Sequence, residues 1–140
     1  MVARAGDSVT YWEPKDGKSV TESCERITAE TTTLADGKWY YVEGNVEMTH
    51  GLALENEAHI ILTDDSRLVI RPPSNTPGIA VRYSSLDSDD LYVYGQEKGT
   101  GKLEVQGGEY AAGIGDGYFG VGGTVTICGG TVTATAIPPR

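Results

Sequence analysis

The chain has 140 residues, with eleven Lys and Arg against twenty Asp and Glu, a net charge of −9, nineteen Gly, eight Tyr and one Phe. The length fits one domain with a continuous core. The acidic balance argues against nucleic acid or an anionic membrane surface as a partner, because phosphate binding needs clustered Lys and Arg.

Two further features bear on location. No apolar run reaches the roughly 18 residues that a membrane helix needs, so we expect no membrane insertion. No secretion signal opens the chain. The composition suits a soluble extracellular module, so we expect a mature or excised part of a secreted or cell-surface protein.

Residues 1–37 differ in composition from the rest of the chain. They are polar and rich in Thr, Ser, Glu and Lys, and Tyr11 and Trp12 stand out as large apolar groups. A repetitive β-structure exposes its core at an open end and needs a segment of atypical sequence to cover it. We predict that residues 1–37 are an N-terminal capping segment with Trp12 as the plug. The alternative is a loosely ordered leader.

From Lys38 the chain is a series of short aliphatic or alternating runs bounded by Gly, Pro and Asp, which indicates strands joined by corners. The predicted strands are Trp39–Val42, Val46–Thr49, Leu52–Leu54, His59–Leu62, Arg67–Ile70, Gly78–Val81, Leu91–Tyr94, Lys102–Val105, Gly113–Ile114, Thr124–Ile127 and Thr131–Thr135. Between the last two lies a Gly-Gly pair, which allows a sharp corner because glycine enters φ > 0 without steric cost.

These strands align in threes. Gly51, Gly78 and Gly113 each precede an aliphatic residue and open a unit, and two further strands follow each of them in the same order. A unit of roughly 27–35 residues with three strands is one turn of a parallel β-helix, in which each strand pairs with its counterpart one turn away. We therefore predict an all-β fold, a right-handed parallel β-helix over residues 38–140. The handedness follows the general preference for right-handed crossovers.

The core would consist of one aliphatic column for each strand position. The predicted columns are Leu52, Ile79 and Ile114; Leu91, Val93, Val125 and Ile127; and Leu68, Ile70, Leu103, Val105 and Val132. An antiparallel sandwich or barrel is the competing architecture, since it also uses many short strands with frequent turns. The ordered repeat favours the β-helix.

The motifs also resemble a repetitive domain of large surface-exposed or secreted proteins of gut-type bacteria, the β-helix or carbohydrate-binding-domain-containing family. The resemblance covers about residues 20–136. It lies in Trp39-Tyr-Tyr-Val-Glu-Gly-Asn-Val46, His59-Ile-Ile-Leu-Thr-Asp-Asp65, Leu91-Tyr-Val-Tyr-Gly-Gln96, Gly99-Thr-Gly-Lys-Leu103, Ala112-Gly-Ile-Gly115 and Gly123-Thr-Val-Thr-Ile-Cys-Gly-Gly-Thr-Val-Thr-Ala134. The chain departs from the family pattern at Cys128, where an Asn-like residue is usual, and at Asp116, where glycine is usual. The resemblance implies a β-helix and carbohydrate binding, and carries no catalytic signature.

Carboxylates are the candidates for catalysis, and they lie mostly at predicted corners, where Asp forms turns. They are Asp64, Asp65, Asp87, Asp89, Asp90 and Asp116. Glycoside hydrolysis needs two carboxylates across a sugar, and no two matching strands both carry an outward Asp. We expect no catalytic residues; a fragment of a lyase-like or hydrolase-like enzyme of polysaccharides is the alternative. His50 and His59 lack further ligands at zinc spacing, so we expect neither metal nor cofactor.

A binding surface has more support. If Leu91 and Val93 point inward, Tyr92 and Tyr94 point outward on one face. Their rings, with nearby acids and an amide, suit the CH faces and hydroxyls of sugars, so the predicted glycan-binding residues are Tyr92, Tyr94, Gln96, Asp89 and Asp90. Further aromatic candidates are Trp39, Tyr41, Tyr110 and Tyr118. The alternative is that tyrosine merely serves as a good strand former.

Two features remain open in the sequence. Cys24 and Cys128 either form a disulfide or are two free thiols. The predicted final strand, Thr131–Thr135, has no evident cap, and uncapped strand edges associate. We therefore expect either further repeats in the parent protein or end-to-end self-association through an open C-terminal end, in a module that would be a structural spacer or adhesin.

Overall fold

The computed structural model describes residues 6–82, 88–116 and 122–137, which form strands and no helix. No helix in these ranges is long and apolar enough to cross a membrane. The strands are β1 (Asp7–Glu13), β2 (Lys18–Arg26), β3 (Thr33–Leu34), β4 (Lys38–Val42), β5 (Asn45–Met48), β6 (Leu52–Leu54), β7 (Glu57–Leu62), β8 (Arg67–Ile70), β9 (Ile79–Ala80), β10 (Asp90–Gly95), β11 (Lys102–Gln106), β12 (Ile114–Gly115), β13 (Thr124–Ile127) and β14 (Thr131–Thr135).

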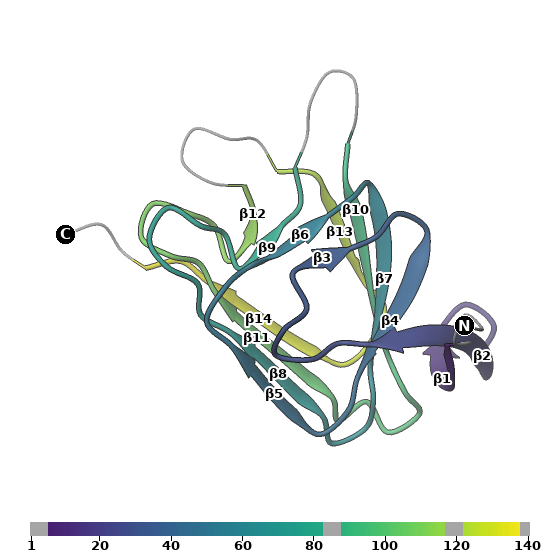
Figure 1. Ribbon diagram of the computed structural model, residues 1–140. Helices are drawn as coiled ribbons and strands as arrows, with labels where there is room; N and C mark the ends of the chain where they lie inside the picture. The colour runs from purple at the N-terminus through teal and green to yellow at the C-terminus, as the bar shows by residue number, and fades with distance from the viewer. Residues whose placement is uncertain (1–5, 83–87, 117–121, 138–140) are drawn as a thin grey trace, which may run out of the picture.

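Three sheets surround one interior (Figure 1). Sheet 1 has the order β1-β2-β4-β7-β10-β13, sheet 2 has β14-β11-β8-β5, and sheet 3 has β12-β9-β6-β3. From β4 onward the chain passes from sheet 1 to sheet 2 to sheet 3 and begins again. We call three successive strands, one from each sheet, a layer.

The pairing within the sheets is parallel. Every pairing between named strands from β2 to β14 is parallel, and β1 with β2 is the antiparallel exception. An antiparallel sandwich is therefore the wrong architecture for this chain. Counterpart strands are far apart in sequence but adjacent in space because each layer repeats the path of the one before.

The strand register confirms the predicted columns of the core except at Ile127, which pairs with the buried Val93 but is 54% exposed and lies outside the core cluster. Ile79 pairs with Leu52 on one side and Ile114 on the other, and Leu103 pairs with both Leu68 and Val132. The inward side chains of all three sheets form a single apolar cluster. Alternation places every second residue of a strand in this cluster, so the aliphatic positions of the sequence become the interior.

The repeated corner glycines are explained by close approach between layers. A Cβ atom added to Gly78 would lie 2.0 Å from Val105 Cγ1 and 2.7 Å from the carbonyl oxygen of Gly113. Backbone from the next layer occupies the space that any side chain would need, so glycine is required at this corner.

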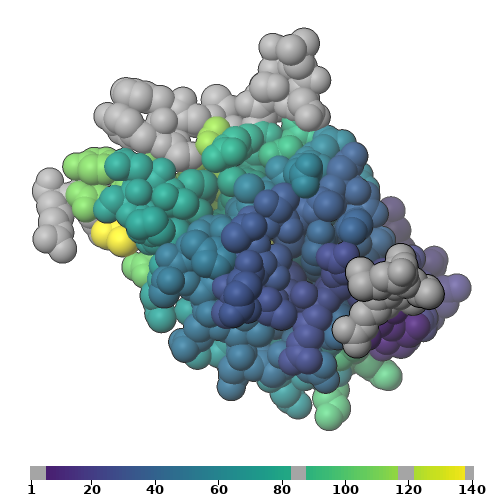
Figure 2. All heavy atoms as spheres, viewed as in Figure 1, coloured from purple at the N-terminus to yellow at the C-terminus, as the bar shows by residue number. Residues whose placement is uncertain are grey.

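The N-terminal segment has two roles. The hairpin of β1 and β2 extends sheet 1 and packs against the outer face of that sheet, where Tyr11 joins a second apolar cluster. Figures 1 and 2 show this hairpin at the side of the molecule, away from the centre of the sheets. Further along, Ile27 and Leu34 are completely buried in the main core and close its N-terminal end. Trp12 is half-buried and belongs to neither cluster, so the expectation that it plugs the core is wrong.

Candidate functional site

An aromatic stack runs across the outer face of sheet 1. Trp39, His59 and Tyr92 occupy the same register position on β4, β7 and β10. The ring centroids of Trp39 and His59 are 4.2 Å apart with 9° between the planes, and those of His59 and Tyr92 are 4.9 Å apart with 12°. Both faces of the imidazole are therefore covered by neighbouring rings, and one face of Tyr92 is covered by the imidazole.

The hairpin covers the next column of this face. Tyr11 lies 4.6 Å from Tyr94 and 4.8 Å from Trp39, measured between ring centroids. Tyr94 is 9% exposed, and burial raises the pKa of its hydroxyl to about 12. The ring of Tyr94 is thus part of a small second core and is not offered to a ligand.

The predicted amide, Gln96, binds other parts of the protein. Its Oε1 accepts a hydrogen bond from the backbone N–H of Asp64 at 2.7 Å, and its Nε2 donates to the carbonyl of Thr10 at 2.9 Å. Gln96 therefore connects a corner of one layer to the next layer and to the hairpin. Its donors and acceptors serve the fold.

Asp89 and Asp90 lie at the opposite end of β10. The carboxylate of Asp89 accepts hydrogen bonds from the backbone N–H groups of Arg82 at 2.9 Å and Asn56 at 3.2 Å, a turn-stabilising role of the kind that Asp commonly plays. Six residues of extended chain, about 20 Å, separate Asp90 from Gln96. The structure does not gather the five predicted residues on one accessible surface.

The other predicted candidates also lie apart from one another in the structure. Tyr41 is 6% exposed and its hydroxyl donates to Asp7 Oδ2 at 2.5 Å, whereas Tyr110 is half-exposed in a loop. Tyr118 and Asp87 lie outside the described residues. Cys24 and Cys128 are both free thiols.

The two histidines are each engaged in local contacts. The ring nitrogens of His50 contact the carbonyl oxygens of Gly51 at 3.1 Å and Ala29 at 2.8 Å. Nε2 of His59 lies 3.1 Å from Glu57 Oε2. Among the residues that the structure describes, no group of three or more His, Cys, Asp or Glu is placed to hold a metal ion.

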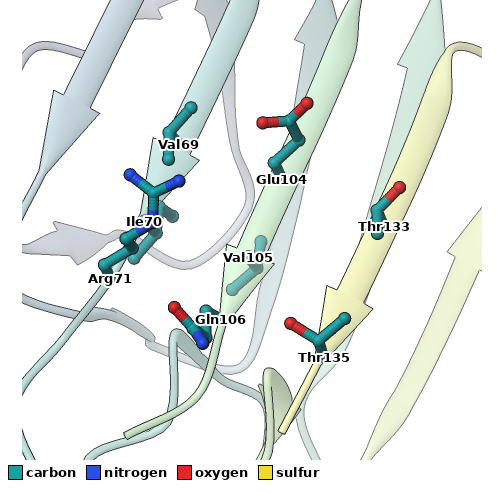
Figure 3. A pocket seen from close by; sticks show the side chains of 8 residues that line it. All are labelled: Val69, Ile70, Arg71, Glu104, Val105, Gln106, Thr133 and Thr135. Atoms are coloured by element: carbon teal, nitrogen blue, oxygen red, sulfur yellow. The ribbon is translucent and has the colours of Figure 1, made fainter. Parts of the chain in front are cut away.

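A polar groove crosses the outer face of sheet 2 (Figure 3). Its volume is about 280 Å³, and it spans β8, β11 and β14. We call it the sheet-2 groove; its lining residues are Val69, Ile70, Arg71, Glu104, Val105, Gln106, Thr133 and Thr135. Register places Glu104 beside Thr133 and Gln106 beside Thr135, with polar side chains from neighbouring strands side by side.

Most polar side chains of this groove form no hydrogen bond with the described part of the protein. Within the described ranges, the side chains of Arg71, Gln106, Thr133 and Thr135 make no hydrogen bond or ion pair to the protein. Glu104 differs, because Arg67 donates to its Oε2 from Nε at 3.0 Å and from Nη2 at 2.6 Å. This hydrogen bond lowers the pKa of the Glu104 carboxyl.

Sequence reasoning missed the sheet-2 groove although its signal was present. The inward residues of these three strands were aligned correctly, and the residues between them must then face outward together. The aromatic side chains of Trp39, Tyr92 and Tyr94, which suit sugar rings, lie on sheet 1 instead. Comparison with family models, with curated proteins and with solved structures finds no match to this chain.

Proposed function

We propose that this chain is a right-handed parallel β-helix that serves as a non-catalytic, glycan-binding module of a secreted or cell-surface protein. The fold proposal is supported by parallel sheets that the chain enters in a fixed rotation. The right hand rests on the general preference of parallel crossovers.

The observation that carries glycan binding is the unpartnered polar lining of the sheet-2 groove. On the outer face of sheet 1, the polar atoms of Gln96 and Tyr41 form hydrogen bonds with the hairpin and with a neighbouring corner. In the sheet-2 groove a guanidinium, an amide and two hydroxyls remain available on adjacent strands.

The spacing of these groups suits an extended, hydroxyl-rich ligand. Neighbouring strands lie about 4.8 Å apart, and alternate residues of one strand lie about 7 Å apart. Arg71, Gln106 and Thr135 therefore offer donors and acceptors at intervals comparable with the length of one sugar ring. Arg71 can also bind a sugar carboxylate bidentately, so uronate polymers belong among the ligands to be tested.

The electrostatics of the sheet-2 groove support binding without turnover. Glycoside hydrolysis uses two carboxyl groups, one of which keeps its proton at neutral pH. Glu104 is the carboxylate that lines the groove, and Arg67 holds it in the ionised form. An ionised, already paired carboxylate is a poor general acid.

The test is a glycan array followed by calorimetry with the polysaccharides that bind. Arg71→Ala and Gln106→Ala should each weaken binding by roughly tenfold or more, whereas Arg26→Ala, an exposed arginine on the hairpin, should leave it unchanged. Absence of binding to every polysaccharide would refute glycan binding. If Tyr92→Ala abolished binding while Arg71→Ala and Gln106→Ala did not weaken it, the sheet-2 groove would be refuted as the binding site. Release of reducing ends or unsaturated products from uronate polymers would refute the non-catalytic role.

A further inference from the structure

The two ends of the sheet-lined core differ. At the N-terminal end, Ile27 and Leu34 are completely buried. At the opposite end, Ile127 is 54% exposed although its register partner Val93 is 0% exposed. The position that forms the interior in one layer is therefore open to solvent in the next.

The strands at this open end each have one unpaired edge. In the described part of the chain, β13 pairs with β10 alone and β14 with β11 alone. Val125 and Val132, which continue two columns of the core, are only half-buried. Backbone hydrogen-bonding groups and apolar side chains are thus exposed together over both strands.

The charge pattern of these edges is the reverse of what protects an edge. Native sheets usually place charges, Pro or bulges on edge strands to prevent pairing with another chain. Residues 122–137 contain no charged residue, whereas the neighbouring inner strands carry Asp90, Lys102 and Glu104. The chain as a whole has a net charge of −9, so an end without charged side chains lets two copies approach with little electrostatic repulsion.

We propose that two copies of this chain associate end to end through β13 and β14. The N-terminal end is closed, so the surface that matches the open end of one copy is the open end of another. This gives a closed, two-fold interface in which each copy uses the same patch. In it β13 lies antiparallel to β13 of the second copy, and Ile127 and Val125 are buried.

The experiment is sedimentation velocity of the whole chain from low micromolar to submillimolar concentration. We expect a monomer–dimer equilibrium. Ile127→Lys places like charges opposite each other in the interface and should raise the dissociation constant by more than about tenfold. Thr21→Lys, which adds the same charge at an exposed position of the hairpin, is the matched control and should still dimerise.

Each outcome bears on the proposal. A monomer at all concentrations overturns it, as does a dimer that Ile127→Lys leaves intact. Growth into ever larger species overturns the two-fold arrangement, because a closed interface stops at two copies. Thermal melting at the lowest concentration should show similar stability for both variants, because Ile127 is exposed in the monomer. If only Ile127→Lys is unfolded, Thr126→Lys, at an exposed position of β13 itself, replaces it and must weaken the dimer.

Discussion

The indole of Trp39 lies flat against the imidazole of His59, with 4.2 Å between ring centroids. This contact follows from parallel register, since residues at the same position of neighbouring strands lie about 4.8 Å apart and flat rings fill that distance. Tyr11 of the hairpin closes over the same stack. The outer face of sheet 1 is therefore a second core that attaches the hairpin.

Truncating Trp39 should destabilise the protein. We expect Trp39→Ala to lower the free energy of unfolding by about 3 kcal/mol, because it removes ring contacts with both His59 and Tyr11. Trp12→Ala is the matched control. Trp12 belongs to neither apolar cluster, so its loss should cost less than about 1 kcal/mol in urea denaturation. Equal losses in the two variants would contradict the second core.

The hydroxyl of Tyr41 should contribute to hairpin attachment. Tyr41→Phe removes its hydrogen bond to the Asp7 carboxylate and should destabilise the protein by about 1.5 kcal/mol. Tyr94→Phe serves as the control, because no protein partner of the Tyr94 hydroxyl is seen among the described residues. Chemical denaturation of both variants checks this, and similar losses would argue against a specific role for the Tyr41–Asp7 bond.

Stability should fall at alkaline pH. Burial raises the pKa of both Tyr41 and Tyr94 from 10.0 to about 12, with the bond to Asp7 adding to the effect at Tyr41. A raised pKa in the folded state means that the unfolded state loses its protons first. The contribution of these groups is complete below pH 10 and disappears as pH rises to about 12. Unfolding free energy against pH should fall less steeply in Tyr41→Phe/Tyr94→Phe, and an unchanged slope would contradict the assignment.

Corner glycines should tolerate substitution according to the space beside them. Gly78→Ala would place Cβ 2.0 Å from Val105 Cγ1, and we expect a loss of at least about 2 kcal/mol from overpacking. At Gly122 the nearest atoms to an added Cβ are 3.8 Å away, so Gly122→Ala should change stability by less than about 0.5 kcal/mol. Thermal melts of the two variants provide the comparison. A tolerated Gly78→Ala would show that the corners are not in close contact.

The two thiols should differ in reactivity. Cys24 is 1% exposed and its burial raises its pKa to about 11, whereas Cys128 is half-buried. Since the thiolate is the reactive form, native protein at pH 8 should be alkylated faster at Cys128. Peptide mass spectrometry after a short exposure measures this, and denatured protein, where both thiols should react alike, is the control.

The sequence by itself determined the strands from β4 onward, their repeat and most of the core. Aliphatic residues at alternate positions lie on one face of a strand, and the corner glycines mark where the backbone turns. The pairing of Ile79 with Leu52 and Ile114 could therefore be predicted. These are local patterns repeated along the chain. They need no knowledge of which distant segments meet.

Tertiary structure alone decided which outward residues remain accessible. Nothing local distinguishes Tyr94 from Tyr92, yet Tyr11 covers Tyr94 because the hairpin folds against sheet 1. Likewise, Gln96 donates a hydrogen bond to Thr10, 86 positions earlier in the chain. Among the residues that the structure describes, Gln106 on sheet 2 has no such partner. Accessibility depends on contacts between residues far apart in sequence, and side-chain alternation carries no information about them.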